Sequence, residues 1–208
     1  MGYDGDDQPA VSASIASPKF ISISTRGSIY FSDRSNHRVR MIGTDGFIHT
    51  VVGTGFPLYS GDGFLASKSQ LFNPVGVSVS SNGDIYLTDT YQDVVRKIDS
   101  QTSIVSRIAG YGYGYGIHGL YGDGGMAVDA LLSDPTQIAI SQNNDIYIAD
   151  TKNNRVRMVN GSGIISTFAG TRRGFYGDGD NVLGAQFNRL KSIAFTNREE
   201  LIIADSGM

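Results

Sequence analysis

The chain has 208 residues, a formal net charge of −3 and no cysteine. The absence of a basic surplus argues against DNA as a partner, and the absence of cysteine excludes disulfides and cysteine-ligated metal centres. No apolar run approaches the roughly 20 residues that a membrane helix needs. The first residues also lack the basic and apolar regions of a signal peptide, so we expect no membrane insertion, and the compartment stays open.

Two short motifs, each present four times, divide the chain into repeats. An apolar run ends in an aspartate at Asp33, Asp89, Asp150 and Asp205. A marker pair lies upstream of each run, at Gly5-Asp6, Gly61-Asp62, Gly122-Asp123 and Gly177-Asp178. Each marker glycine precedes its strand-end aspartate by 28 residues. This fixed register predicts repeats over residues 2–58, 59–118, 119–173 and, truncated, 174–208.

Each repeat has the pattern of four short strands, here named A to D. In the second repeat we expect strands at 75–80, 84–88, 94–99 and 104–109, with Asn82-Gly83 in the A–B turn because both residues tolerate positive φ. Strand B is almost wholly apolar, whereas strand C alternates charged and apolar residues. Four-stranded units repeated along a chain predict an all-β fold, a β-propeller of antiparallel four-stranded blades with about three and a half blades present.

The run from Ile146 to Arg157, which contains Ala149-Asp150-Thr151-Lys152-Asn153-Asn154-Arg155, closely resembles the NHL repeat signature. The segment from Asp33 to Arg40 resembles it as well. Gly122-Asp123-Gly124-Gly125, upstream of Leu132 and Pro135, is similar to the long-linker NHL variety found in bacterial and plant proteins and in teneurins. The second repeat departs from this pattern at Tyr91-Gln92-Asp93-Val94. The resemblance implies a propeller of six or so blades that binds proteins or, in some members, RNA or small ligands.

Three and a half blades cannot close a ring, because propellers have four to eight. An open arc would expose apolar blade faces and unpaired strand edges. Two hypotheses follow: the sequence is part of a larger propeller, or two chains associate to complete a ring.

Charged residues recur once per blade and have structural and functional interpretations. A carboxylate rim of the four strand-end aspartates could hold a cation, but we favour Asx-type turns in which each accepts N–H bonds within the B–C loop. Arg40, Arg96 and Arg157 follow three of these aspartates by seven residues. With Asp33 opposite Arg38 and Phe31 opposite Arg40, each such arginine is a diagonal neighbour of its aspartate, which favours a structural ion pair. Arg38 and Arg155 are the candidates for binding an acidic partner.

The links between repeats supply the remaining candidates. Asp178-Gly179-Asp180 begins like a calcium loop but continues with Val182 and Leu183, so we interpret the Gly-Asp markers as glycine-assisted turns. Gly114 to Gly119 matches a dinucleotide-binding motif by letter but opens no expected helix.

Tyrosines in these links include both structural and binding candidates. Tyr59, Tyr121 and Tyr176 recur at what we interpret as one structural position. Tyr113 and Tyr115, in the longest link, have no counterparts and are our binding candidates, since glycine with tyrosine is typical of adaptable binding loops.

The sequence favours a non-enzymatic scaffold that binds a protein or a small ligand, without metal or cofactor. The G-x-S-x-G and H-E-x-x-H signatures are absent, and His37 is expected to face solvent. The alternatives are a hydrolase or lyase with a metal-assisted site in the central channel and, against the acidic balance, an RNA-binding domain.

Overall fold

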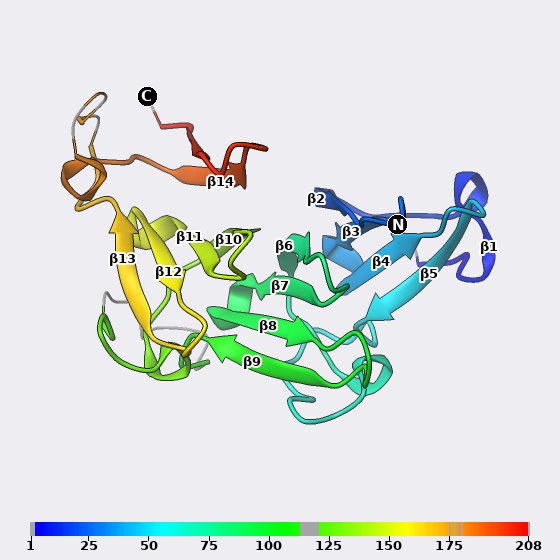
Figure 1. Cartoon of the computed structure of the whole chain (residues 1–208). Helices are drawn as coiled ribbons and strands as arrows, with labels where there is room; N and C mark the ends of the chain where they lie inside the picture. Colours follow the sequence, from blue (N-terminus) through cyan, green and yellow to red (C-terminus); the bar gives the residue numbers. More distant parts are fainter. Residues whose placement is uncertain (1–2, 113–120, 175, 178, 180, 208) are drawn as a thin grey trace. The chain divides into compact units, whose positions relative to one another are not determined.

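The computed structural model describes residues 3–112, 121–174, 176–177, 179 and 181–207. The described residues form short β-strands and three-residue 3-10 helices, and Figure 1 shows them along the chain. The strands are β1 (Gln8–Pro9), β2 (Pro18–Ile23), β3 (Ile29–Asp33), β4 (Arg38–Ile42), β5 (Phe47–Val52), β6 (Pro74–Val79), β7 (Ile85–Asp89), β8 (Val94–Ile98), β9 (Val105–Ala109), β10 (Pro135–Ile140), β11 (Ile146–Asp150), β12 (Arg155–Val159), β13 (Ile165–Ala169), β14 (Leu190–Phe195) and β15 (Leu201–Asp205). The 3-10 helices are η1 (Ala10–Ser12), η2 (Arg34–Asn36), η3 (Ala66–Lys68), η4 (Thr90–Gln92), η5 (Ala127–Asp129), η6 (Thr151–Asn153) and η7 (Val182–Gly184).

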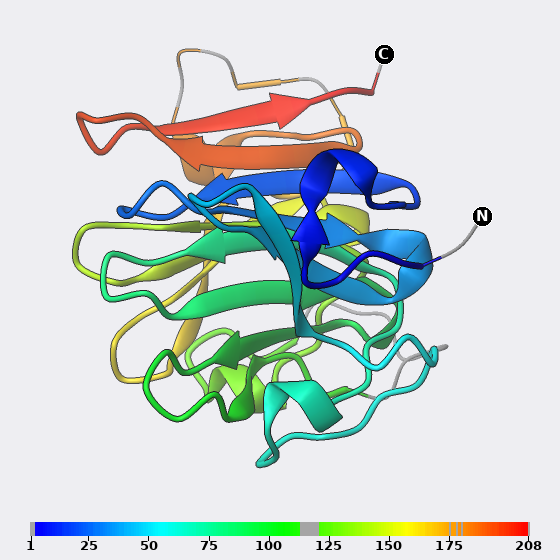
Figure 2. The same ribbon diagram turned by 90° about the vertical axis from the view of Figure 1, so that its right-hand side faces the viewer.

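The strands pair into four separate antiparallel sheets, one for each repeat. The second and third sheets have the orders β6-β7-β8-β9 and β10-β11-β12-β13. The first adds the two-residue β1 outside β5, and the fourth consists of β14 and β15, the orange and red hairpin in Figure 2. The prediction of four-stranded antiparallel blades is confirmed: three blades are complete and a fourth is represented by strands A and B. In the second blade every expected strand boundary lies within one residue of the observed one.

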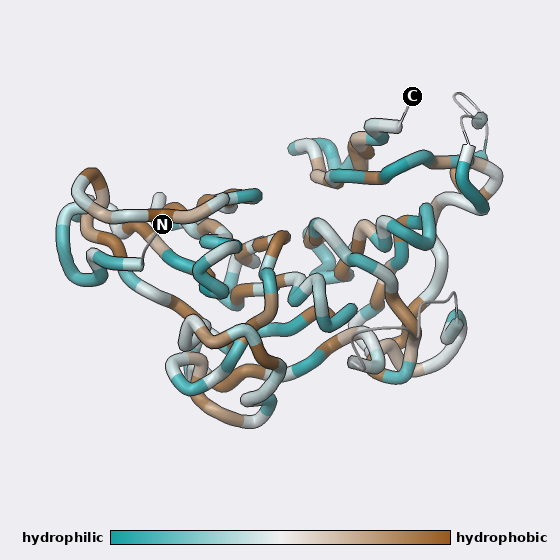
Figure 3. The backbone as a smooth tube through the Cα atoms, turned by 180° about the vertical axis from the view of Figure 1, so that it is seen from behind, coloured by the Kyte–Doolittle hydropathy of each residue, from teal (hydrophilic) through white to brown (hydrophobic). Residues whose placement is uncertain are grey.

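The chain divides into two compact units, Met1–Gln92 with Arg96–Arg107, and Asp93–Val95 with Ile108–Met208. The core of the first unit lies where the first blade meets the second, with Val39, Leu71 and Leu87 fully buried. The core of the second unit lies where the third blade meets β14 and β15, around Val156 and Leu190. Figure 3 shows short apolar segments interleaved with polar ones. No helix among the described residues is long and apolar enough to cross a membrane.

The A–B turn of the second blade differs from the expected geometry. Gly83 has a φ of 91°, whereas Asn82 is not among the residues with positive φ. The N–H of Gly83 donates to the Ser80 carbonyl at 3.0 Å, and the N–H of Ser80 donates to the Asp84 carbonyl at 3.0 Å. The turn is therefore longer than a two-residue hairpin and needs the left-handed conformation at its last residue only. Asn82-Gly83 lies in the A–B turn as expected, but only Gly83 adopts a positive φ.

The expected strand register is confirmed. Asp33 lies opposite Arg38 and Phe31 opposite Arg40 in β3 and β4. The B–C loop that sets this register is a single 3-10 turn followed by a left-handed residue, His37 with a φ of 54°. The third blade repeats the arrangement, with Asp150 opposite Arg155. Residues two apart on one strand share a face of the sheet. Arg40 and Arg157, two residues beyond Arg38 and Arg155, therefore lie on the same face as the strand-end aspartate of their blade.

Candidate functional site

An arginine with a fully buried side chain lies between two aspartates in each complete blade. These arginines are Arg40, Arg96 and Arg157. Arg96 Nη1 lies 3.6 Å from Asp89 Oδ2, and Arg96 Nε donates to Asp62 Oδ1 at 3.0 Å. Its two terminal nitrogens also donate to the backbone carbonyls of Gln70 and Ser60, at 2.7 and 2.9 Å. A buried cation needs this degree of compensation, and it ties strand C to the link that precedes the blade.

The strand-end aspartates accept backbone hydrogen bonds, but not within the B–C loop as the sequence suggested. Asp33 Oδ1 accepts the N–H of Ala16 and Asp89 Oδ1 that of Phe72, both at 2.7 Å. These donors lie 17 residues upstream, where the chain enters strand A. The interpretation as an Asx turn local to the B–C loop is therefore wrong, because the carboxylate joins two distant segments of one blade. Asp205, in the half-blade, accepts the N–H of Asn188 in the same way at 2.8 Å.

Burial raises the pKa of two strand-end aspartates although an arginine lies beside each. The pKa of Asp89 rises to about 7 and that of Asp150 to about 6, because desolvation penalises the charged form. The Asn153 amide donates to Asp150 Oδ2 at 2.8 Å and opposes that effect. Among the described residues no hydrogen bond reaches Asp89 Oδ2, and Gln92 stands where the first and third blades have asparagine.

The Gly-Asp markers also have a role that the sequence reasoning missed. Asp62 pairs with Arg96, and Asp123 Oδ1 lies 2.7 Å from Arg157 Nη2. The signal was present as a constant spacing of 34 residues between each marker aspartate and its arginine. Gly61 has a φ of 95°, and a Cβ there would lie 2.6 Å from the Ser69 backbone. Only glycine allows this close approach. Asp178 lies outside the described residues.

Arg38 and Arg155, the candidates for an acidic partner, are half-buried and have partners within the protein. Arg38 donates to the carbonyls of Asn36 and Thr54, at 3.0 and 2.8 Å. Arg155 donates to the Asn153 carbonyl at 2.9 Å, and burial lowers its pKa. Each guanidinium therefore closes its own B–C loop.

The structure separates the tyrosines that seemed to share one position. Tyr121 pairs with Leu131 in a β-bridge as Ser60, not Tyr59, pairs with Gln70. Tyr121 is 71% exposed, which contradicts the structural role expected from that alignment. Tyr59 donates its hydroxyl to Asp62 at 2.5 Å and packs over Arg96. Tyr113 and Tyr115 lie outside the described residues.

His37 was expected to face solvent, and this is wrong. Its ring is half-buried, and its Nδ1 accepts the N–H of Asn73 at 3.2 Å. Its ring also packs edge-on against Phe72. Burial and the nearby Arg38 and Arg34 lower its pKa, so at neutral pH the ring is uncharged and can accept this bond from the second blade. Within the described residues no group of three or more histidines and carboxylates could hold a metal ion.

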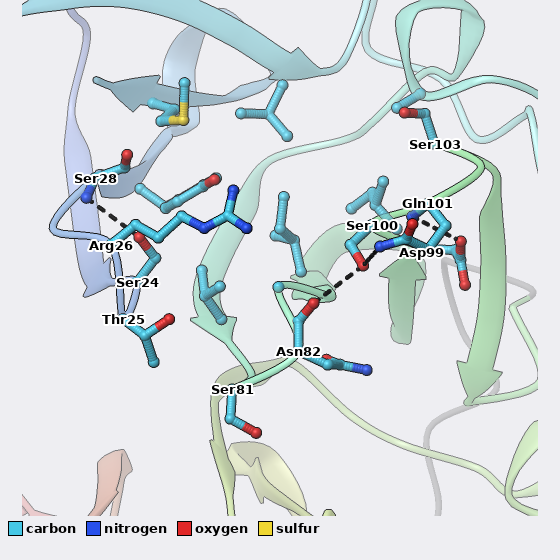
Figure 4. A pocket seen from close by; sticks show the side chains of 18 of the residues that line it. Ser24, Thr25, Arg26, Ser28, Ser81, Asn82, Asp99, Ser100, Gln101 and Ser103 are labelled. Atoms are coloured by element: carbon cyan, nitrogen blue, oxygen red, sulfur yellow. Dashed lines mark hydrogen bonds between the residues drawn. The ribbon is translucent and has the colours of Figure 1, made fainter. Parts of the chain in front are cut away.

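A groove of about 720 Å³ lies between the first and second blades, within the first unit. The A–B turns of both blades and the C–D turn of the second blade line it, together with η3. Figure 4 shows Arg26 extending from the first A–B turn toward the wall that carries Asn82, Ser100 and Gln101. Apolar side chains from the two sheets complete the lining: Tyr30, Met41, Val51, Leu65, Val79, Ile85 and Ile98. A volume of this size is typical of small-molecule sites.

Small side chains explain why this groove is open. The strand registers make Val51 and Val79 equivalent to Phe168 and Phe195 of the second unit. There the two phenylalanine rings pack edge-on against Tyr147, with ring centroids 4.9 and 5.0 Å away. In the first unit the equivalent tyrosine, Tyr30, and the two valines pack against the core and line the groove. The fold thus accommodates both a filled and an open version of the same position.

Comparison with known proteins identifies the repeat type. The profile of the Teneurin NHL domain matches residues 2–60 and 118–176, more than half of the chain. Teneurin-4 of Homo sapiens is 30% identical over 225 residues and covers 98% of this chain, which spans only 8% of that protein. A chain of the nidogen/laminin complex superposes with a TM-score of 0.59 at 14% identity, covering 92% of this chain and 56% of that one. Catalytically inactive H270A virginiamycin B lyase from Staphylococcus aureus with quinupristin superposes with a TM-score of 0.56 at 18% identity, covering 91% of this chain and 49% of that one. The chain therefore belongs to the Teneurin NHL domain family and has a β-propeller fold.

Proposed function

We propose that this NHL propeller segment is a non-enzymatic binding scaffold and that the groove between its first two blades holds a ligand. The observation that carries the proposal is the open groove itself. In the second unit two phenylalanine rings occupy the same position, so the repeat does not require the space. Exposed apolar surface inside a concave site is typical of ligand binding.

The buried charges support a scaffold role. Arg40, Arg96 and Arg157 are each compensated by two aspartates, so they stabilise the blades and leave the loops to carry specificity. A scaffold with variable loops is a common use of repeat folds. The net charge of −3 gives no electrostatic reason for RNA to bind.

A screen by ligand-observed NMR tests the proposal, using the whole chain and a chemically diverse set of small molecules and short peptides. We expect some compounds to bind without being chemically converted. These compounds should no longer bind to a Val51→Phe/Val79→Phe variant, in which the two rings fill the groove. The variant's thermal unfolding serves as the control for folding, since phenylalanine occupies both equivalent positions in the second unit. Conversion of a bound compound into product would favour the enzyme alternative, and binding that is indifferent to the variant would refute the groove.

A further inference from the structure

We propose that the groove binds a small monocarboxylic acid with an apolar body, whose carboxylate pairs with Arg26. The inference rests on the proposed function and adds the chemical class of the ligand. Three features of the groove lead to it: its apolar floor, one uncommitted cation and a hydroxyl-rich rim.

The floor offers apolar surface that the blades leave uncovered. Tyr30, Val51 and Val79 remain half-buried although they pack against the core of the unit, Met41 is half-buried as well, and Leu65 is 48% exposed. Transfer of this surface away from water is favourable at about 25 cal/mol per Å². An aliphatic or aromatic body of modest size would cover it.

Arg26 supplies the charge. It is exposed, and among the described residues no hydrogen bond or ion pair engages its guanidinium. By contrast, Arg38, Arg40 and Arg96 of the same unit all donate to backbone carbonyls. Burial raises the pKa of Tyr30 and the charge of Arg26 opposes that rise, so the guanidinium acts on the floor of the groove. A guanidinium beside apolar surface suits a planar carboxylate, which it can bind with two hydrogen bonds.

The opposite wall limits the ligand to one anionic group. Asp99, the other charged residue of the lining, uses Oδ1 to accept the N–H groups of Gln101 and Thr102, at 3.0 and 2.8 Å. These bonds lower its pKa, so it is ionised at neutral pH and would repel a second carboxylate. The rim carries neutral donors instead: Thr25, Ser28, Ser67, Ser81, Ser103 and Gln101. A monocarboxylate meets attraction on one side and neutral hydrogen-bond partners around it.

Isothermal titration of the whole chain with decanoate and 4-phenylbutyrate, and with their primary amides, tests the inference. We expect the acids to bind more tightly than the amides. Arg26→Gln should weaken the acids by about tenfold, the loss expected for one hydrogen bond to a charged group, and leave the amides unchanged. Arg198→Gln is the matched control, because Arg198 holds the same place in the A–B turn of the half-blade. It should change nothing.

Three results would overturn the inference. They are equal binding of acids and amides, an Arg26→Gln variant that binds the acids as before, and binding of carboxyl-terminal peptides in place of the free acids. If the groove-filling variant loses ligands that carry no carboxylate, the proposed function stands and the ligand class is wrong. If no compound of any class depends on the groove, both fail.

Discussion

Replacement of Gln92 by asparagine should restore a hydrogen bond that the second blade lacks. In the first blade the Asn36 amide donates to both oxygens of Asp33, at 3.0 and 2.9 Å. In the second blade Gln92 stands at that place, and no donor within the described part of the chain forms a hydrogen bond with Asp89 Oδ2. Hydrogen bonding to the ionised form of a carboxyl lowers its pKa. Gln92→Asn should therefore make the ionised form of Asp89 easier to bury.

The third blade gives the size of the effect. With its asparagine donor in place, Asp150 has a pKa of about 6, whereas that of Asp89 is about 7. A difference of this size corresponds to on the order of 1 kcal/mol between the two protonation states. The folded pKa of Asp89 lies above the ordinary value of 3.8, so its contribution to the free energy of unfolding is greatest at low pH. That contribution falls as the pH rises through about 7.

Urea unfolding of both proteins at pH 5 and pH 8 measures the effect. At pH 5 Asp89 is protonated in both proteins, so the new hydrogen bond does not stabilise a charged carboxylate and adds little to the free energy of unfolding. At pH 8 it is ionised, and the variant should gain on the order of 1 kcal/mol more than at pH 5. Asn153→Gln is the reverse control, because it removes the corresponding donor in the third blade. Its free energy of unfolding should fall, and the loss should be larger at pH 8 than at pH 5. A Gln92→Asn gain that is equal at the two pH values would refute the reasoning.

Three further substitutions test other parts of the structure. Arg157→Met leaves two aspartates without their cation and should lower the free energy of unfolding by about 3–5 kcal/mol, measured in urea. Gly122→Ala forces a side chain into a φ of 107° against the Ala130 backbone, and should cost more than about 1 kcal/mol in the same assay. Val79→Phe alone should raise the melting temperature, because the ring covers the floor of the groove as Phe195 covers Tyr147; a lower melting temperature would mean that the groove cannot accept it.

The sequence predicted the blades because their signals are local and repeated. Strand alternation, the strand-end aspartates and the B–C loop length together determined the register that places Arg40 near Asp33. The partner of each buried arginine in the preceding link was missed, because a contact across 34 residues leaves no local pattern beyond a constant spacing. The shift between Tyr59 and Tyr121 was missed although the marker glycines show it: Tyr121 directly precedes Gly122, whereas Ser60, not Tyr59, directly precedes Gly61.

The groove could not be predicted from repeat motifs. It depends on a difference between equivalent positions, valine at 51 and 79 against phenylalanine at 168 and 195. These side chains come together only when two sheets pack against each other. The links between repeats differ in length, so no constant sequence spacing marks the pair. Arg26 gave no signal either, because the equivalent place in the other A–B turns is taken by asparagine or, at Arg198, by another arginine, so the residue type alone does not mark a binding site.

Methyl NMR of the selectively labelled chain tests the central claim most directly, the claim that the space between the first two blades is a binding site. On titration with decanoate, the methyl signals of Met41, Val51, Leu65 and Val79 should shift together and saturate. Those of Val156 and Leu190, in the core of the second unit, should stay in place. Shifts spread over both units, or none at the four groove residues, would contradict the account.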